Sequence, residues 1–238
     1  MRVAIISDIH GNQVALAAVL EDLARQGTVD QIVVAGDLCL NGPRPREVLE
    51  MVQRLHCPVL QGNVDSEVVT KAPRKSGKKQ NMAGWVRAQI GPEGVAYLAA
   101  LPFSYRINNH KANSSDLLVV HANPLDQEQA IFPTASDSTL EYLLGGLDAG
   151  ISALAFGHYH VAYQRRWRHL LLVDVGSCGL PRDGDLRASY AILTWRDGNW
   201  QAEHRRVPYD VEKVVQQIKE SGMPNVEKRI KVLTEAKY

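Results

Sequence analysis

Four of the eight histidines in this 238-residue chain lie where short apolar runs end, together with carboxylate and amide side chains in the same kind of place. The residues that share this placement are Asp8, His10, Asp37, Asn63, His121, His158 and His160. Imidazole nitrogens and carboxylate oxygens together bind first-row transition metals, and they are also the groups used in hydrolytic chemistry. A single histidine at such a point is more often structural. Seven groups of this kind indicate a metal site.

The elements that would position the first of these groups form a strand-helix-strand unit. Residues 3–6 and 32–35 are continuous apolar runs typical of buried strands. Between them, apolar residues recur with helical spacing from Leu16 to Leu23, and Gly27 follows where a helix would end. Such units cross over right-handed and make the two strands parallel. We therefore expect Asp8 and Asp37 to lie side by side at one sheet edge.

The pairs Asp8 with His10 and His158 with His160 each have one residue between their members. If these segments are extended, both members of a pair point to the same side. Each pair would then contact one object.

The rest of the chain continues the α/β pattern without a linker long enough to divide it, so we expect one domain over 1–238. A helix is predicted at 45–55 and a strand at 58–61, and a helical insertion is predicted over 71–101. Further strands are predicted at 117–120, 153–156, 170–175, 188–194 and 200–207. Helical spacing returns at 139–147 and at 211–218, within C-terminal helices expected over 209–238.

Composition excludes several classes of protein. The chain has 27 basic and 26 acidic residues, so its net charge of +1 offers no global field for nucleic acid or anionic lipid. Three cysteines form no CxxC pair and are expected to be reduced. No run of 18 apolar residues and no signal-peptide core is present, so we expect a cytoplasmic protein. The insertion contains a basic loop, which could gather a polyanion but is more commonly a solvated surface; its residues are Lys71, Arg74, Lys75, Lys78 and Lys79.

Five sequence blocks together resemble the calcineurin-like metallophosphoesterase superfamily. They are DIHGN at 8–12, GDLCLNGP at 36–43, GNVD at 62–65, VHA at 120–122 and GHYH at 157–160, in the family's order. The stretch GSCGLPRDGD at 176–185 is similar to the small phosphodiesterase-like members of bacteria and archaea. Each block alone is weak, whereas the set covers most of the chain.

The resemblance implies a four-layer α/β/β/α sandwich of two mixed sheets flanked by helices, with two divalent metal ions at the strand ends. Asp8, His10 and His160 would bind the first ion. Asn63, His121 and His158 would bind the second. Asp37 would bridge both, and the catalytic set would be Asp37, Asn63 and His121. The ligands are nitrogen and oxygen without thiolate, which suits Mn, Fe, Zn, Co or Ni, and manganese is the first expectation among them. Cys39, two residues after Asp37, is more readily explained as a small buried hydrophobe than as a ligand.

The expected reaction is hydrolysis of a phosphodiester by in-line attack of a hydroxide that bridges the metals. Many family members have a histidine directly after the Gly-Asn pair, which is thought to protonate the leaving oxygen, and this chain has Val64. Losing a general acid costs about 10²–10⁴ in rate for a poor leaving group, which favours diesters over monoesters. A different residue or a metal-bound water could instead supply the proton.

Residues beside the ligands have two interpretations each. Asn12, Asn41 and Arg182 are expected to contact the substrate phosphate, with turn-forming roles equally open for the asparagines. Asp65 would either orient a ligand histidine or cap a helix. The expected partner is a small phosphate ester or nucleotide, without membrane or nucleic acid, and the oligomeric state is not indicated.

Two alternatives remain open at this stage. The same chemistry would serve a phosphomonoesterase or a dinucleoside polyphosphate hydrolase. A different class is a non-catalytic scaffold that retains the fold. A nuclease would need a basic groove, which the net charge does not supply.

Overall fold

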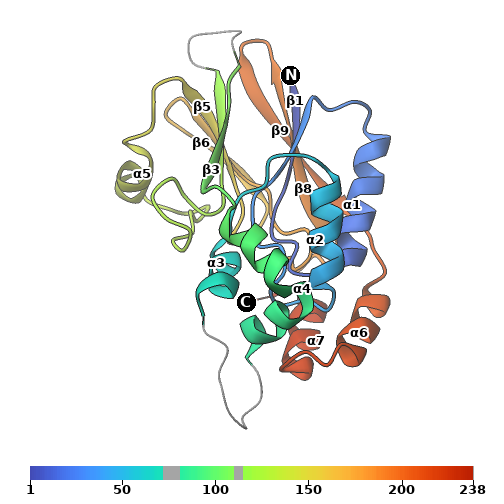
Figure 1. Ribbon diagram of the computed structural model, residues 1–238. Coiled ribbons are helices and arrows are strands. Elements are labelled where there is room, and N and C mark those ends of the chain that lie inside the picture. Colours follow the sequence, from blue (N-terminus) through green and yellow to red (C-terminus); the bar gives the residue numbers. More distant parts are fainter. Residues whose placement is uncertain (72–80, 110–114, 238) are drawn as a thin grey trace.

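Two mixed β-sheets packed face to face form the centre of the fold in the computed structural model (Figure 1). The structure describes residues 1–71, 81–109 and 115–237. The first sheet has the order β2-β1-β8-β9. Its strands are β1 (Arg2–Ile6), β2 (Gln31–Val34), β8 (Ala188–Arg196) and β9 (Asn199–Val207). β1 pairs parallel with β2 and antiparallel with β8. The expected parallel strand-helix-strand unit is therefore present, and its two carboxyl ends lie together.

The second sheet has the order β3-β4-β5-β7-β6. Its strands are β3 (Ser104–Ile107), β4 (Asp116–Val120), β5 (Ile151–Phe156), β6 (Tyr163–Trp167) and β7 (Leu170–Asp174). The central strands β4, β5 and β7 are parallel, and their carboxyl ends lead to the second group of site residues. The first sheet's inner face, with Val3 and Ile5, packs on the second sheet's inner face, with Leu117 and Val119.

Helices cover the outer faces of both sheets and complete the four-layer sandwich that the motifs implied. On the first sheet, α1 (Gln13–Arg25) and α2 (Pro45–Arg54) pack against Ala4 and Ile6. On the second, α5 (Asp137–Leu144) packs against Leu154 and Phe156. Burial of one apolar face of each element on its neighbour supplies the core.

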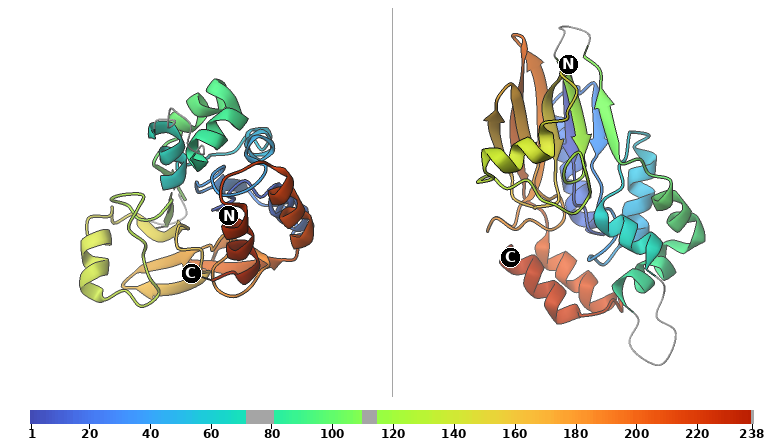
Figure 2. Two further views of the ribbon diagram at one scale, coloured as in Figure 1. Left: turned by 90° about the horizontal axis from the view of Figure 1, so that it is seen from below. Right: turned by 90° about the vertical axis from the view of Figure 1, so that its left-hand side faces the viewer.

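Two further helical pairs lie at the end of the molecule to which the carboxyl end of β1 points (Figures 1 and 2). One is α3 (Asn63–Thr70) with α4 (Met82–Ala99), and the other is α6 (Val211–Glu220) with α7 (Val226–Glu235). Helix α4 is broken at Gly91, which has a φ of 70° and is followed by Pro92. The two predicted helical stretches therefore meet at a kink. Except for Lys71, the predicted basic loop lies outside the described residues. None of the described helices combines the length and apolar character needed to cross a membrane.

The structure differs from the predicted elements in three respects. Residues 58–61 form only an isolated bridge between Val59 and Val34 rather than a strand, since Pro58 has no amide hydrogen to donate. Strands β3 and β6 were not expected, because their exposed faces carry charged residues that hide the apolar alternation. Helix α3 was also missed, because it is short and has only two buried residues.

Candidate metal centre

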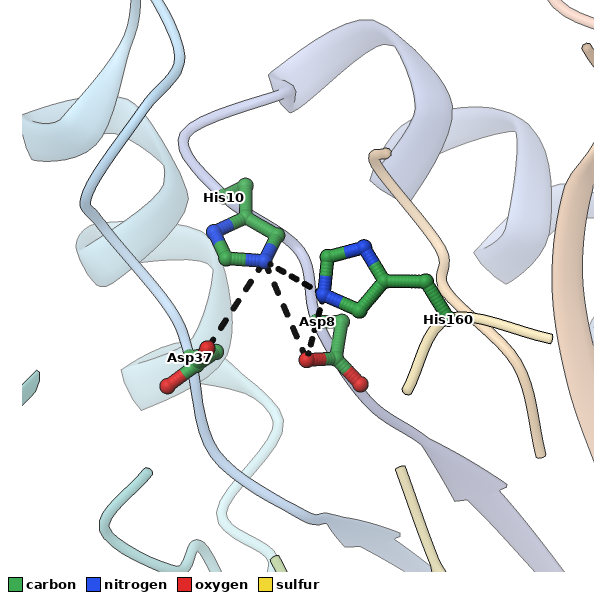
Figure 3. A group of neighbouring side chains, drawn as sticks. All are labelled: Asp8, His10, Asp37 and His160. Atoms are coloured by element: carbon green, nitrogen blue, oxygen red, sulfur yellow. Dashed lines mark hydrogen bonds and ion pairs between the residues drawn. The ribbon is translucent and has the colours of Figure 1, made fainter. Parts of the chain in front are cut away.

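Four side chains from three separate segments converge in one buried cluster (Figure 3). Asp8 and His10 follow β1, Asp37 follows β2, and His160 follows β5. One ligand atom from each of these residues lies within 4.8 Å of the others. All four side chains are buried, and Asp8 is inaccessible to solvent. The expectation that Asp8 and Asp37 lie side by side is therefore confirmed.

The Nε2 atom of His10 lies close to a ligand atom of each of the other three residues. It lies 3.1 Å from Nε2 of His160, 3.8 Å from Oδ1 of Asp8 and 3.7 Å from Oδ2 of Asp37. The Nε2 atom of His160 is also 3.1 Å from Oδ1 of Asp8. These atoms face one another and point to a common centre (Figure 3).

Hydrogen bonds to the backbone decide which ring nitrogen of each histidine faces that centre. His10 donates from Nδ1 to the carbonyl of Leu40 at 2.9 Å, and His160 donates from Nδ1 to the carbonyl of Leu180 at 2.6 Å. A carbonyl can only accept, so in the neutral ring the proton is on Nδ1 and the lone pair is on Nε2. Two lone pairs then face each other at 3.1 Å, an arrangement that a cation between them stabilises.

The carboxylate of Asp8 also has a lone pair available for a cation. Its Oδ2 accepts a hydrogen bond from the backbone amide of His158 at 2.9 Å. Its Oδ1 is buried and has no hydrogen-bond partner among the described residues. An unpaired buried carboxylate oxygen is costly, and a cation satisfies it. The donor set, its lone pairs and this oxygen therefore fit a metal ion.

A second group lies on the other side of Asp37. His121 donates from Nδ1 to the carbonyl of Ala35, and its Nε2 is 3.1 Å from Oδ1 of Asn63. The ring of His158 lies 5.2 Å from that of His121, centroid to centroid. His158 donates from Nε2 to the carbonyl of Glu128, so its lone pair is on Nδ1 rather than on Nε2.

The two carboxylate oxygens of Asp37 face different sets of side chains, one the set with His10 and the other the set with His121. Its Oδ2 is 3.7 Å from Nε2 of His10, and its Oδ1 is 3.5 Å from Nε2 of His121. The structure thus brings all seven predicted ligands together, divided into the two sets that the resemblance implied. Pairing by sequence position was right for Asp8 with His10 and wrong for His158 with His160, which lie in different sets.

The backbone at both pairs of residues also differs from the expected conformation. The segments are not extended as assumed, since four of these residues adopt left-handed conformations, with φ of 56° at Asp8, 50° at His10, 69° at His158 and 61° at His160. Asp37 has a φ of 57°. Non-glycine residues adopt this region uncommonly, and those held there by surrounding contacts cluster at functional sites and in turns.

Without a cation, the two carboxyl groups of the site separate in pKa. Burial and the nearby Asp8 charge raise the pKa of Asp37 well above its usual value. Burial also opposes ionisation of Asp8, but the neighbouring His160, His121 and His10 outweigh it and lower the pKa of Asp8 overall. Two carboxyl groups this close resist holding two negative charges. A divalent cation removes the conflict.

Burial, followed by the neighbouring His160, lowers the pKa of His10 to about 3. In the unfolded chain the group titrates near 6.5, so between these values the unfolded state binds a proton that the native state does not. We therefore expect acidification to cost the metal-free protein up to about 1.4 kcal/mol per pH unit through this one histidine. The loss begins near pH 6.5.

The measurement is urea unfolding of metal-free wild type and His10→Gln between about pH 7 and pH 5. Because the buried carboxyl groups titrate in both proteins, the difference in slope isolates His10. The wild type should lose more stability on acidification than the variant. Equal slopes would show that His10 is not held neutral by burial.

Asp65 acts on the backbone rather than on a histidine. Its carboxylate accepts from the amides of Asp37, Leu38 and Gly62 at 2.8, 2.9 and 3.0 Å. The helix-capping alternative is therefore the one observed, and Asp65 also holds the turn that carries Asp37.

The residues expected beside the substrate have different positions. Asn12 is buried; its Oδ1 accepts from Ala15 at the start of α1 and its Nδ2 donates to the carbonyl of Gly179, as a turn-forming residue would. Asn41 is half-buried with a φ of 84°, and it lines a small cavity with His10. Arg182 is half-buried, and its amide donates to the carbonyl of His160. Substrate contacts of all three stay predictions.

Cys39 is buried and directs Sγ to the carbonyl of Pro45, and burial raises the pKa of its thiol. This agrees with a packing role. All three cysteines are free.

Glu128 is the residue that sequence reasoning missed. Its carboxylate accepts from Nδ2 of Asn63 at 3.2 Å, which directs the amide oxygen of Asn63 toward His121. Its carbonyl accepts from His158. No motif surrounds Glu128, and it lies in a loop between β4 and α5, so nothing in the sequence places it beside both ligands.

Comparisons with known proteins support a relationship over the full chain. A sequence model described as the calcineurin-like phosphoesterase superfamily domain matches residues 1–198. An uncharacterized protein of Methanocaldococcus jannaschii is 30% identical over 241 residues, covering 93% of both proteins. The crystal structure of a metallophosphoesterase from Sphaerobacter thermophilus is similar with a TM-score of 0.81 and 30% identity, covering 99% of both chains.

A further relative is similar over part of the chain. The symmetrical bis(5'-nucleosyl)-tetraphosphatase of Paracidovorax citrulli is 30% identical over 141 residues, which cover 58% of this chain and 47% of that protein.

Proposed function

The chain belongs to the calcineurin-like phosphoesterase superfamily and is a hydrolase acting on phosphoester bonds, and from this premise we propose that it is a dinuclear metal-dependent phosphodiesterase. The observation that carries the proposal is Asp37, whose two oxygens face His10 and His121 in two separate ligand sets. One carboxylate shared between two sets is the arrangement that bridges paired cations.

The proposed ligands divide as the geometry suggests. Asp8, His10 and His160 bind one cation, and Asn63, His121 and His158 bind the other. His10, His121 and His160 would coordinate through Nε2 and His158 through Nδ1, because their other ring nitrogens donate to backbone carbonyls. The nitrogen and oxygen donors fit manganese, which we propose as the metal.

Paired divalent cations supply an activated water molecule and orient phosphoryl oxygens for in-line displacement. The protein's own residues fix the geometry. Asp65 holds the turn of Asp37, and Glu128 holds the amide of Asn63. The backbone carbonyls fix each imidazole in one tautomer, so no ring has to reorient when metal binds.

Val64 is the reason for preferring diesters. It is partly buried, packs against the core and lies in the first turn of α3 directly after Asn63. Its hydrocarbon side chain cannot donate a proton to a leaving group. A diester with a good leaving group does not need that proton.

A dinucleoside polyphosphate is the second candidate substrate, favoured by the likeness to the tetraphosphatase over 58% of the chain. The free cysteines support a cytoplasmic location.

The test is elemental analysis of the purified protein, followed by turnover after reconstitution with manganese. Bis(p-nitrophenyl) phosphate, p-nitrophenyl phosphate and a dinucleoside tetraphosphate are the substrates to compare. We expect two metal equivalents per chain and faster turnover of the aryl diester than of the monoester. One metal per chain, or no turnover of any of the three, would refute the proposal. The second outcome would favour the scaffold alternative.

A further inference from the structure

A pair of aromatic rings lies beside the candidate metal centre. The ring centroids of Phe132 and Tyr159 are 4.8 Å apart, and the ring planes meet at 84°. Tyr159 stands in the chain between the proposed ligands His158 and His160. Phe132 belongs to the loop between β4 and α5, whose Glu128 contacts the second ligand set. The ring contact therefore joins a ligand-bearing segment to this loop.

The metal centre reaches solvent on the same side. Five of the seven proposed ligands are buried, whereas Asn63 and His158 are partly exposed. Glu128, which contacts both of these ligands, is itself exposed. Tyr159, which follows His158, is also partly exposed. A substrate that comes from solvent therefore enters beside the second ligand set, where the aromatic pair lies.

The ring of Phe132 is exposed although the backbone that carries it is held in place. Phe132 is 46% exposed, whereas the preceding Ile131 is fully buried. The hydroxyl of Tyr163 donates to the carbonyl of Ile131. Arg165 donates to two carbonyls just after Phe132, each at 3.0 Å. An aromatic side chain on a fixed backbone loses little conformational freedom when a ligand covers it, which favours binding.

The perpendicular arrangement of the two rings leaves a flat surface available. In an edge-to-face pair, each ring keeps at least one face that the contact does not cover. One aromatic side chain buries roughly 150–250 Å², well below the roughly 800 Å² per partner of a stable protein interface. A single ring face does match one planar heterocycle, and stacking of this kind accepts every nucleobase. The size of the surface thus favours a base over a protein partner.

We propose that Phe132, supported by Tyr159, is a stacking platform for the base of a nucleotide substrate. This inference rests on the proposed function. The phosphate that reacts would lie at the metal centre, and a single sugar would join it to the base on Phe132. The preferred diesters are then nucleotide esters rather than diesters with small alkyl groups.

The first experiment compares Phe132→Ala with wild type, after manganese reconstitution, on two diesters that share one leaving group. The p-nitrophenyl ester of thymidine 5'-monophosphate carries a base, and methyl p-nitrophenyl phosphate does not. On the nucleotide ester, the variant should lose about 5- to 100-fold in kcat/KM, the range for one stacked base. The loss should appear mainly in KM, because stacking is present before and during the reaction. On the methyl ester it should stay within about threefold.

Further variants separate a flat ring from apolar bulk. Phe132→Tyr keeps the ring and should keep the preference for the nucleotide ester, whereas Phe132→Leu should lose it. Tyr142→Ala is the matched control, since it removes a ring that is 70% exposed on α5, the helix on the outer face of the second sheet. It should change neither rate by more than about twofold. Equal losses on both esters in Phe132→Ala, or no loss on either, would overturn the platform.

A binding measurement separates this inference from the proposed function. Purified protein, with the metal it carries, is titrated calorimetrically with adenosine 5'-monophosphate and with ribose 5-phosphate, which lacks the base. We expect wild type and Tyr142→Ala to bind the nucleotide about 5- to 100-fold more tightly, and Phe132→Ala to bind the two compounds alike. Equal or absent binding by wild type, or a preference that persists in Phe132→Ala, overturns the platform. If the preference is found but no ester is hydrolysed, the proposed function fails and the platform stands.

Discussion

Asp37→Ala should abolish phosphodiester hydrolysis, with a loss of at least about 10³-fold in kcat, because metal stabilisation of the transition state supplies several kcal/mol. The variant removes the only side chain whose oxygens face both proposed ligand sets of the described structure. It also removes a buried carboxyl group whose pKa is raised by burial. Asp37 also accepts a hydrogen bond from the amide of Val64 at 3.1 Å, which the variant loses. We expect metal content to fall together with activity.

The measurement is kcat on bis(p-nitrophenyl) phosphate together with metal content per chain. Asp137→Ala is the control, because this exposed aspartate lies in the first turn of α5, away from the site. It should keep full activity and metal content. If Asp37→Ala retains turnover at near wild-type rate, Asp37 does not hold the catalytic ions.

Gly179→Ala should cause a large loss of stability. A Cβ atom at this position would lie 1.8 Å from the carbonyl oxygen of Ile9, which is backbone between Asp8 and His10. The amide of Gly179 donates to the backbone carbonyl of Asp8, and the carbonyl of Gly179 accepts from the side chain of Asn12. The segment at Gly179 therefore cannot move away from the segment at 8–12 without breaking these hydrogen bonds. We expect a loss of about 3 kcal/mol or more in the free energy of unfolding, and weaker metal binding.

Urea unfolding and metal titration measure the two effects. Gly146→Ala is the matched control, since a Cβ there meets no atom within 4 Å and its φ is not in the left-handed region. It should be nearly neutral. If the Gly179→Ala protein is as stable as the Gly146→Ala protein, the backbone at Gly179 does not pack against the backbone of Ile9 as closely as described.

Most of the fold could be predicted from local patterns. The parallel pairing of β1 with β2 follows from two apolar runs joined by an amphipathic helix, and the central strands of the second sheet are predominantly apolar. The edge strands β3 and β6 of the second sheet were harder, because exposed charged residues alternate with the apolar ones. The segment at 58–61 was overestimated for the opposite reason, since its apolar content reflects burial at Leu60 rather than a full ladder of hydrogen bonds.

The seven candidate ligands were identifiable from residue type and motif, but their division into two sets was not a matter of spacing. His158 and His160 lie in different sets, whereas Asp8 and His10, which are also two apart and also left-handed, lie in one. Conformations of this kind are stabilised by contacts from elsewhere, such as the hydrogen bond from His158 to Asp8, and no local rule predicts them.

By itself, the sequence determined which residue types were available and that strand ends would bring them to one edge, since apolar periodicity and the handedness of the crossover are local properties of the chain. Tertiary structure alone decided the tautomer of each histidine and the contacts of Glu128 with Asn63 and His158. Each of these depends on a carbonyl or carboxylate contributed by a distant segment. Such partners meet only when the whole chain has folded, because hydrogen bonds and charge interactions act through space and not along the chain.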